Sequence, residues 1–338
     1  MKLHISLFAL AAVLSSEAHA QQSDVDPAAQ ALGASSNKLI CETVSPEFPY
    51  AHKYISVNGV KLAYVEIGKG DPIILTHGNP TSSYMWRNVI PELAKYGRVI
   101  ALDAAGHGKS ETTSTDYDFS DYIDSLEGFI QKKKLKNVTL VMHDWLPGAA
   151  GFEYARRHED NVKGLAFMES VMGPRFPSSF EDISVPFQNF MRFAKTPEFQ
   201  ESVVEKNAFV ENMRTEPCGI SDEAFAQYAA PFEVKSRRRV LQAYPITVPV
   251  GPDADGEAAQ IVQAYSDWLK ASPLPKLLIR AEPGAILDTE SAGEIVKTMP
   301  NLSVVTVKTA VHFIPETHPG KVGRELSHWF QEISRKRP

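Results

Sequence analysis

The sequence predicts an α/β protein with a mostly parallel, doubly wound sheet and an inserted helical cap. Short apolar runs, each typical of a strand that is buried on both faces of a sheet, recur along the chain. Segments with helical periodicity separate these runs, which is the alternation that builds a parallel sheet. The alternation stops between about 170 and 272, where aromatic and helical segments replace strands. We interpret that stretch as a cap over the sheet.

The individual elements follow from local patterns. Asn58-Gly59 joins the first two strand-like runs, and the positive φ angles of such a turn suit a β-hairpin. The predicted strands are Tyr54–Val57, Val60–Val65, Ile73–Thr76, Val99–Leu102, Thr139–Met142, Leu165–Met168, Leu277–Ile279 and Val304–Val307. Between two of them, apolar residues from Tyr122 to Ile130 recur on one helix face, and we expect Ser120 to cap this helix.

The N-terminal segment has the pattern of a secretory signal peptide. Lys2 precedes an apolar run, Ile5–Leu14, and Ala18-His19-Ala20 provides a cleavage site ahead of Gln21. The run is too short to span a bilayer, which needs about 20 apolar residues. We therefore expect an exported protein, periplasmic or secreted. The expected parts are a signal peptide (1–20), a flexible lead-in (21–45), a core (46–169 and 273–338) and a cap (170–272).

Composition and charge exclude several classes of function. The 35 basic and 41 acidic side chains of the 338 residues are intermixed and give a net charge of −6, so nucleic acid binding is not expected. No cluster has zinc-ligand spacing and no dinucleotide fingerprint occurs, so no metal or organic cofactor is expected. The two cysteines, Cys41 and Cys218, do not form a disulfide framework. We expect unpaired thiols packed as small apolar groups, with a single disulfide as the alternative.

A candidate nucleophile lies in a strand–turn–helix unit. The strand Thr139–Met142 leads into His143-Asp144-Trp145, and a helical stretch follows. This is the context of a nucleophile elbow, which lifts one side chain above the sheet edge. A carboxylate at this place can displace a leaving group from a saturated carbon, whereas a serine would give an inert ether. The alternative is that Asp144 only caps the following helix.

Two neutral donors could hold a departing anion. Asn79, in the turn after the strand that begins at Ile73, carries an amide NH₂, and Trp145 carries an indole N–H. Neither group becomes negative, so both suit an anion site. Taken singly, Asn79 could be a turn residue and Trp145 a core aromatic.

The last predicted strand places a general base at the same edge of the sheet. His312 lies just beyond Val304–Val307, in the chain order nucleophile, acid, histidine that sheet hydrolases use. Glu169 and Asp288 both follow strands and could orient its imidazole, and spacing does not decide between them. We expect the other histidines near predicted strand ends, His107 and His143, and also His318, to have loop or packing roles.

These motifs together resemble the haloalkane dehalogenases of the α/β-hydrolase superfamily. The resemblance runs from about Phe48 to Trp329 and rests on three motifs, His77–Tyr84, Val141–Trp145 and Met168-Glu169. It implies the α/β-hydrolase fold and the hydrolysis of a carbon–halogen bond through an aspartyl alkyl ester. The sequence is also similar to the coelenterazine luciferase of the sea pansy, for instance at 168–171.

The resemblance assigns roles residue by residue. Asp144 matches the nucleophile, His312 the water-activating base and Glu169 the acid, with Asp288 as reserve acid at the place that another subfamily uses. Asn79 and Trp145 match the halide clamp. The cap positions that would line the substrate pocket are Phe187, Phe190, Phe209, Tyr244 and Pro245. The implied partners are a small apolar halogenated substrate and a halide ion.

The elbow departs from the family pattern. Relatives usually have glycine directly after the Asp-Trp pair, whereas this chain has Leu146-Pro147-Gly148 and one residue more before Gly151. A side chain at a crowded turn strains it. We therefore expect a wider turn that displaces the Trp145 indole and lowers activity.

Two other functions fit parts of the pattern. An epoxide hydrolase would use the same nucleophile, base and acid but would need paired tyrosines on the cap, for which Tyr244 and Tyr228 are available. The presence of Asn79 instead favours a site that binds a halide ion. A noncatalytic binding protein on the same scaffold is the third hypothesis, motivated by the altered elbow.

Overall fold

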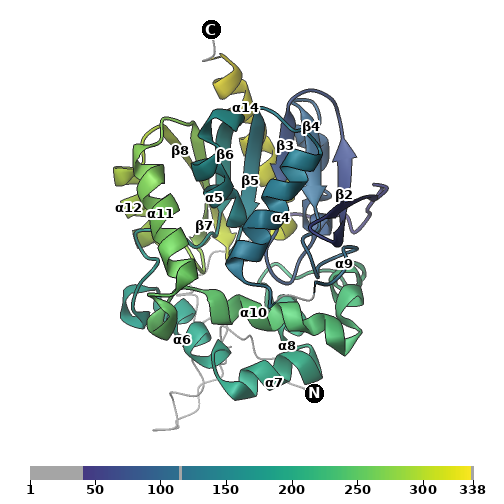
Figure 1. The fold of residues 1–338 in the computed structure, drawn as a ribbon, viewed down its shortest axis with the longest axis vertical. Helices are drawn as coiled ribbons and strands as arrows, with labels where there is room; N and C mark the ends of the chain where they lie inside the picture. Colours follow the sequence, from purple (N-terminus) through teal and green to yellow (C-terminus); the bar gives the residue numbers. More distant parts are fainter. Residues whose placement is uncertain (1–40, 114–115, 336–338) are drawn as a thin grey trace.

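The computed structural model describes residues 41–113 and 116–335. They form an eight-stranded sheet in the order β1-β2-β4-β3-β5-β6-β7-β8 (Figure 1). The strands are β1 (Lys53–Val57), β2 (Val60–Ile67), β3 (Pro72–Leu75), β4 (Arg98–Leu102), β5 (Val138–His143), β6 (Val162–Met168), β7 (Lys276–Pro283) and β8 (Leu302–Ala310). Strand β2 pairs antiparallel with β1 and β4, and all other pairs are parallel. The predicted mostly parallel sheet is confirmed.

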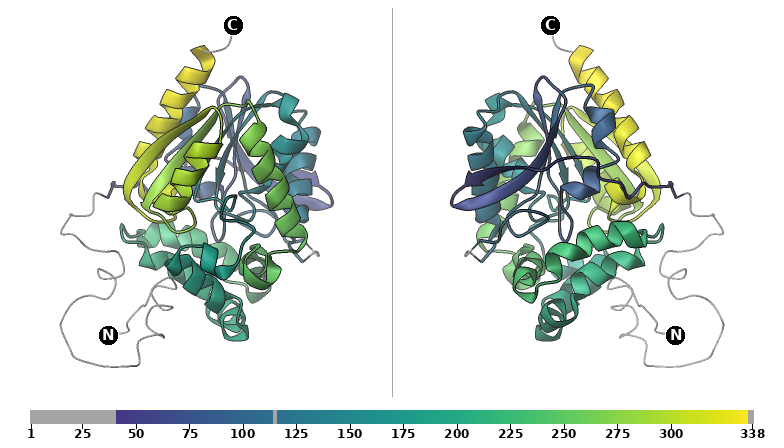
Figure 2. Two further views of the ribbon diagram at one scale, coloured as in Figure 1. Left: turned by 90° about the vertical axis from the view of Figure 1, so that its left-hand side faces the viewer. Right: turned by 90° about the vertical axis from the view of Figure 1, so that its right-hand side faces the viewer.

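Helices cover both faces of the sheet. The helices of the described chain are α3 (Ile90–Leu93), α4 (Phe119–Lys132), α5 (Ala150–Arg157), α6 (Val185–Ala194), α7 (Pro197–Lys206), α8 (Ala208–Glu211), α9 (Asp222–Ala229), α10 (Arg239–Thr247), α11 (Glu257–Ala271), α12 (Thr289–Thr298), α13 (Ile314–Thr317) and α14 (Pro319–Arg335). In Figure 2, α14 lies on one face, and α4 and α11 lie on the other. Each face has its own buried apolar cluster, which is why the central strands are apolar on both sides.

The local predictions hold with one exception. Asn58 and Gly59 have φ angles of 49° and 82°, as the hairpin turn between β1 and β2 requires. Helix α4 buries the predicted apolar face, including Tyr122 and Ile130. The expected cap at Ser120 is wrong, because the N-cap of α4 is Asp118 and Ser120 lies within the first turn of the helix, which begins at Phe119.

The cap helices α6 to α10 lie together across the carboxyl-terminal edge of the parallel strands (Figure 1). Helix α11 falls within the range expected for the cap but packs on the sheet layer beside α5. There the rings of Tyr265 and Phe152 stack with centroids 5.2 Å apart. Periodicity shows that a helix has an apolar face, but only packing shows which layer buries that face.

A buried ion pair joins the cap to the core. Arg87 donates two hydrogen bonds to the Glu316 carboxylate, at 2.5 and 2.7 Å, and both side chains are nearly inaccessible to solvent. Tyr228, on cap helix α9, donates a hydrogen bond to the same carboxylate at 2.5 Å. The Arg87 Nε donates to the backbone carbonyl of Ser45 at 2.8 Å, which attaches the end of the predicted lead-in. One charged group thus connects three parts of the chain.

Cys41 and Cys218 form a disulfide with a Cα–Cα separation of 5.4 Å. The expectation of unpaired thiols is wrong, because folding brings together residues that are 177 positions apart. The bond attaches the segment before β1 to the loop between α8 and α9 of the cap. The predicted signal peptide (1–20) and most of the predicted lead-in lie outside the described residues. Within the described ranges, no helix is long and apolar enough to cross a membrane.

Removal of this disulfide should destabilise the protein. We expect Cys218→Ser to lower the free energy of unfolding by about 2–4 kcal/mol, because the cross-link restricts a long loop in the unfolded chain. Thermal unfolding with and without dithiothreitol provides the measurement. The reductant should lower the midpoint of the parent chain and leave that of Cys218→Ser unchanged. Equal midpoints for the oxidised parent and the variant would contradict a stabilising role.

Candidate active site

A strained turn presents the candidate nucleophile. Asp144 directly follows β5, has a φ angle of +72° and is completely buried. Such a φ is uncommon for a residue with a side chain and persists only where its surroundings impose it. The peptide between Leu146 and Pro147 is cis, and α5 begins at Ala150. The strand–turn–helix unit that the sequence predicts is therefore present.

Two glycines leave the room that this turn needs. A Cβ atom on Gly78 would lie 2.1 Å from the Asp144 Oδ2, and one on Gly148 would lie 1.7 Å from the His143 carbonyl oxygen. Both distances are far below van der Waals contact, so side chains there would displace the elbow. The Leu146 side chain, which we expected to widen the turn, is buried in the apolar core. Gly148 therefore provides the close approach of the turn to the end of β5.

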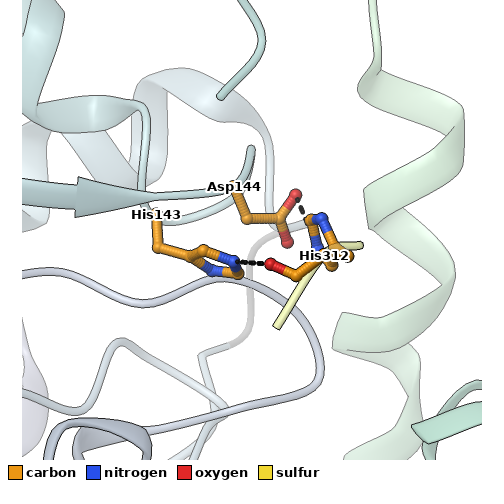
Figure 3. A group of neighbouring side chains, drawn as sticks. All are labelled: His143, Asp144 and His312. Carbon is orange, nitrogen blue, oxygen red and sulfur yellow. Dashed lines mark hydrogen bonds and ion pairs between the residues drawn. The ribbon is translucent and has the colours of Figure 1, made fainter. Parts of the chain in front are cut away.

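Three elements contact the Asp144 carboxylate. The backbone N–H of Asn79 donates to Oδ2 at 3.1 Å. The Tyr244 hydroxyl, on cap helix α10, donates to Oδ1 at 2.9 Å. The Nε2 of His312 lies 3.6 Å from the same Oδ1 (Figure 3). One oxygen is thus held by the backbone, while the other faces the base and the cap.

Glu169, and not Asp288, lies beside His312. The Glu169 Oε2 is 3.4 Å from the His312 Nδ1 and accepts hydrogen bonds from the backbone N–H groups of Ala285 and Ile286, at 2.9 and 2.8 Å. The Asp288 carboxylate instead caps α12, where it accepts hydrogen bonds from the backbone and hydroxyl of Ser291. Of the two carboxylates that sequence spacing left open, the structure thus places only Glu169 next to His312.

The two carboxylates raise the pKa of His312. Burial lowers the pKa of His312, but the opposing charges and hydrogen bonds of Asp144 and Glu169 outweigh this effect and raise it to about 10. With both carboxylates ionised, His312 therefore holds a proton near neutral pH. Loss of the charge on Asp144 would remove the largest cause that raises the pKa of His312, so the ring could lose its proton and become available as a base.

His143, for which we expected a loop or packing role, positions the base through its backbone. Its Nε2 donates a hydrogen bond to the His312 carbonyl oxygen at 2.9 Å (Figure 3). Burial, together with the charge of the neighbouring His312, lowers the pKa of His143 to about 3, so the ring is neutral. Among the described residues, His143, Asp144 and His312 also form the one cluster with metal-binding geometry. In this cluster the His143 Nε2 is the donor of the hydrogen bond to the His312 carbonyl oxygen, so this nitrogen is not available as a metal ligand.

The two predicted halide donors differ in their surroundings. Asn79 lines the cavity above Asp144, and its amide nitrogen lies 3.4 Å from the Val240 carbonyl oxygen. Its amide oxygen hydrogen-bonds to the Nε2 of His107, a second histidine with a role that sequence reasoning missed. The indole N–H of Trp145 donates to the Thr247 hydroxyl at 3.0 Å, and Trp145 is not among the described residues that line the cavity. The structure thus brings Asn79, but not Trp145, to the cavity.

The cavity over the nucleophile is mostly apolar. Its lining residues are Asn79, Asp144, Phe187, Phe190, Phe209, Asn212, Tyr244, Ile286, His312 and Phe313. Four of the five predicted cap positions are among them, whereas Pro245 is buried within α10 and does not line the cavity. Sequence reasoning missed Asn212, Ile286 and Phe313. A signal existed for Phe313, which directly follows the predicted base, but none for the other two.

Comparisons with known proteins agree with this architecture. Residues 71–319 match the family model described as "alpha/beta hydrolase fold". A haloalkane dehalogenase of Mycolicibacterium smegmatis is 34% identical over 298 residues, which cover 84% of this chain and 93% of that protein. One from Sphingobium indicum is 37% identical over 296 residues, covering 83% and 95%.

Solved structures give the same result. The haloalkane dehalogenase DbeA from Bradyrhizobium elkani superimposes with a TM-score of 0.79 at 31% identity, covering 85% of this chain and 99% of that one. The haloalkane dehalogenase DatA from Agrobacterium tumefaciens has a TM-score of 0.77 at 29% identity, covering 84% and 97%.

The sheet order, the elbow and the acid–histidine pair define a hydrolase of the α/β-hydrolase superfamily. Within that superfamily, the chain belongs to the haloalkane dehalogenases.

The close approach at Gly148 can be tested directly. We expect Gly148→Ala to lower the rate of halide release about 100-fold or more, because displacement of the elbow by about 1 Å misaligns the nucleophile. Gly293→Ala is the matched control, since a Cβ atom there meets nothing within 4 Å. Halide release by the two purified variants is the measurement. Equal rates would show that the elbow tolerates a side chain at Gly148.

Proposed function

We propose that Asp144 attacks the halogen-bearing carbon of a small apolar haloalkane and that water then hydrolyses the resulting alkyl ester to an alcohol. The observation that carries this proposal is the position of the Asp144 Oδ1, which faces an apolar cavity with His312 at 3.6 Å. An ionised carboxylate with one oxygen held by the Asn79 backbone presents the other to a substrate. The phenylalanine side chains of the cavity favour an alkyl chain over a polar substrate.

The charge on Asp144 links the two chemical steps. Ester formation neutralises this carboxylate and so removes the main attraction that keeps His312 protonated. His312 then loses its proton and can take one from water, while Glu169, 3.4 Å away, orients the ring. Hydrolysis restores the carboxylate. The same group therefore acts as nucleophile and sets the protonation of the base.

The departing halide needs hydrogen-bond donors that remain neutral. The Asn79 amide group lines the cavity and has an N–H available in addition to the one directed at Val240. The Trp145 indole would have to exchange the Thr247 hydroxyl for the halide in order to contribute. We propose Asn79 as the first donor and Trp145 as a second donor that is recruited by this exchange.

Removal of the base should separate the two steps. We expect His312→Phe to form the alkyl ester and then fail to hydrolyse it, because no group remains to activate water. Intact-mass measurement after incubation with 1-bromohexane should show one added hexyl group. Asp144→Asn is the control and should show no added mass. An unmodified His312→Phe chain that is folded by circular dichroism would contradict the role of His312.

The acid can be identified by comparing two carboxylates. Glu169→Gln should lower the rate of hydrolysis about 100-fold or more, because the charge that stabilises protonated His312 is lost. Asp288→Asn should change the rate less than about twofold, since asparagine also caps helices well. Steady-state halide release by both variants is the measurement. The opposite order of rates would transfer the role to Asp288.

We also propose that the mature chain is exported to the periplasm. The signal-like segment at 1–20 and the Cys41–Cys218 disulfide support this location, because disulfides persist in oxidising compartments. Expression of the full chain in a Gram-negative host, followed by fractionation and N-terminal sequencing, tests it. We expect periplasmic protein that begins at Gln21. Cytoplasmic protein with an intact N-terminus would contradict the proposal.

A further inference from the structure

The cap places a phenol directly on the nucleophile. The Tyr244 hydroxyl donates to the Asp144 Oδ1 at 2.9 Å, and the side chain is buried. Its ring packs edge-to-face against Phe209 with centroids 5.5 Å apart, so the cavity wall holds the phenol in place. Nucleophilic displacement of a halide requires no such acid, because a halide leaves as a stable anion.

Tyr244 is the one tyrosine among the described residues that line the cavity. The other cap tyrosine that the sequence offered, Tyr228, donates its hydroxyl to Glu316 in the buried ion-pair network. Of the two cap tyrosines that were available for an epoxide hydrolase, only Tyr244 therefore faces the reacting carboxylate. One phenol is enough to transfer the single proton that an epoxide oxygen takes up. The indole N–H of Trp145, the other aromatic donor near the elbow, donates its hydrogen bond to the Thr247 hydroxyl.

The surroundings keep this phenol protonated until the nucleophile reacts. Burial raises the pKa of Tyr244 well above its usual value, and the charge of Asp144 and the hydrogen bond to it raise the pKa further. Ester formation removes the charge of Asp144, so the acidity of Tyr244 increases as Oδ1 bonds to carbon. An acid that strengthens at this moment suits a leaving group that is a strong base.

We propose that this site also opens epoxides to vicinal diols, with Tyr244 as the catalytic acid that protonates the epoxide oxygen. The proposal rests on the proposed function, because it uses the same nucleophile and base. The Asp144 Oδ1 forms a bond to one epoxide carbon, and the bond between that carbon and the ring oxygen breaks. The Tyr244 hydroxyl exchanges its contact with Oδ1 for the ring oxygen and transfers its proton there. The products are a hydroxyalkyl ester of Asp144 and the Tyr244 phenolate.

Hydrolysis then restores both groups. Once Asp144 is an ester, His312 releases its proton and the Tyr244 phenolate takes one up. His312 then takes a proton from water, and the hydroxide adds to the ester carbonyl. The diol oxygen leaves with the proton of the carboxyl group that forms, so Asp144 is again ionised, His312 protonated and Tyr244 neutral. The sum is one epoxide and one water giving one diol, with no other reactant.

The experiment compares two substrates of equal chain length on the same protein. Bromide release from 1-bromohexane and diol formation from 1,2-epoxyhexane are measured for the parent chain and for Tyr244→Phe. We expect the parent to convert both substrates. Loss of a general acid costs about 100-fold or more, so Tyr244→Phe should lose diol formation by at least that factor. Bromide release by the same variant is the reference, so the ratio of diol formation to bromide release should also fall about 100-fold or more. Circular dichroism shows that the variant is folded.

Two further variants make the outcome decisive. Tyr228→Phe, which removes the cap hydroxyl outside the cavity, should change the ratio of the two activities less than about twofold. Asp144→Asn should lose both activities. Bromide release without diol formation by the parent, or diol formation by Tyr244→Phe at the parent rate, would overturn the epoxide proposal alone. Bromide release by Asp144→Asn at the parent rate would instead overturn the proposed function.

Discussion

The steric constraint at the end of β5 determines the rest of the site. Asp144 adopts a backbone conformation that side chains disfavour, and it does so because Gly78 and Gly148 leave space for its carboxylate and for the turn. This conformation directs the carboxylate above the edge of the sheet, where the carboxyl ends of β6 and β8 bring Glu169 and His312. A relaxed turn would keep the same residues in the chain but would not bring them together.

The single negative charge on Asp144 governs the protonation of two neighbours that come from different parts of the chain. It raises the pKa of His312 from the core and of Tyr244 from the cap. Both effects are electrostatic, so both decrease together when the carboxylate becomes an ester. A buried site transmits such a change strongly, because little solvent screens it. In the proposed mechanism, formation of the ester therefore makes His312 available as a base and Tyr244 as an acid.

The cap is attached to the rest of the chain at α9 and at the loop before it. Arg87, Glu316 and Tyr228 connect the core to α9, and the Cys41–Cys218 disulfide attaches the segment before β1 to the loop between α8 and α9. Glu316 lies four residues after His312, so the ion pair also anchors the segment that carries the base. Removal of one partner of a buried ion pair leaves an uncompensated charge, which is strongly destabilising. The cap and the base therefore share one point of attachment.

The sequence by itself determined the features that depend on neighbouring residues. Apolar runs specified all eight strands, Asn58-Gly59 the hairpin turn, and the strand–turn–helix pattern at Asp144 the elbow, because each depends on a few consecutive side chains. His312 could be predicted as well, since parallel strands end at one edge of a sheet. The family resemblance added the cap positions, of which four line the cavity.

Only the tertiary structure decided which side chains meet. It placed Glu169 instead of Asp288 beside His312, paired Cys41 with Cys218, packed α11 on the sheet and brought Tyr244 to Asp144. It also placed His107 against Asn79 and His143 against the His312 backbone. These contacts join residues that are far apart along the chain, so they depend on how helices and loops pack. The periodic pattern of one segment does not show how a distant segment packs against it, and this packing decides which side chains meet.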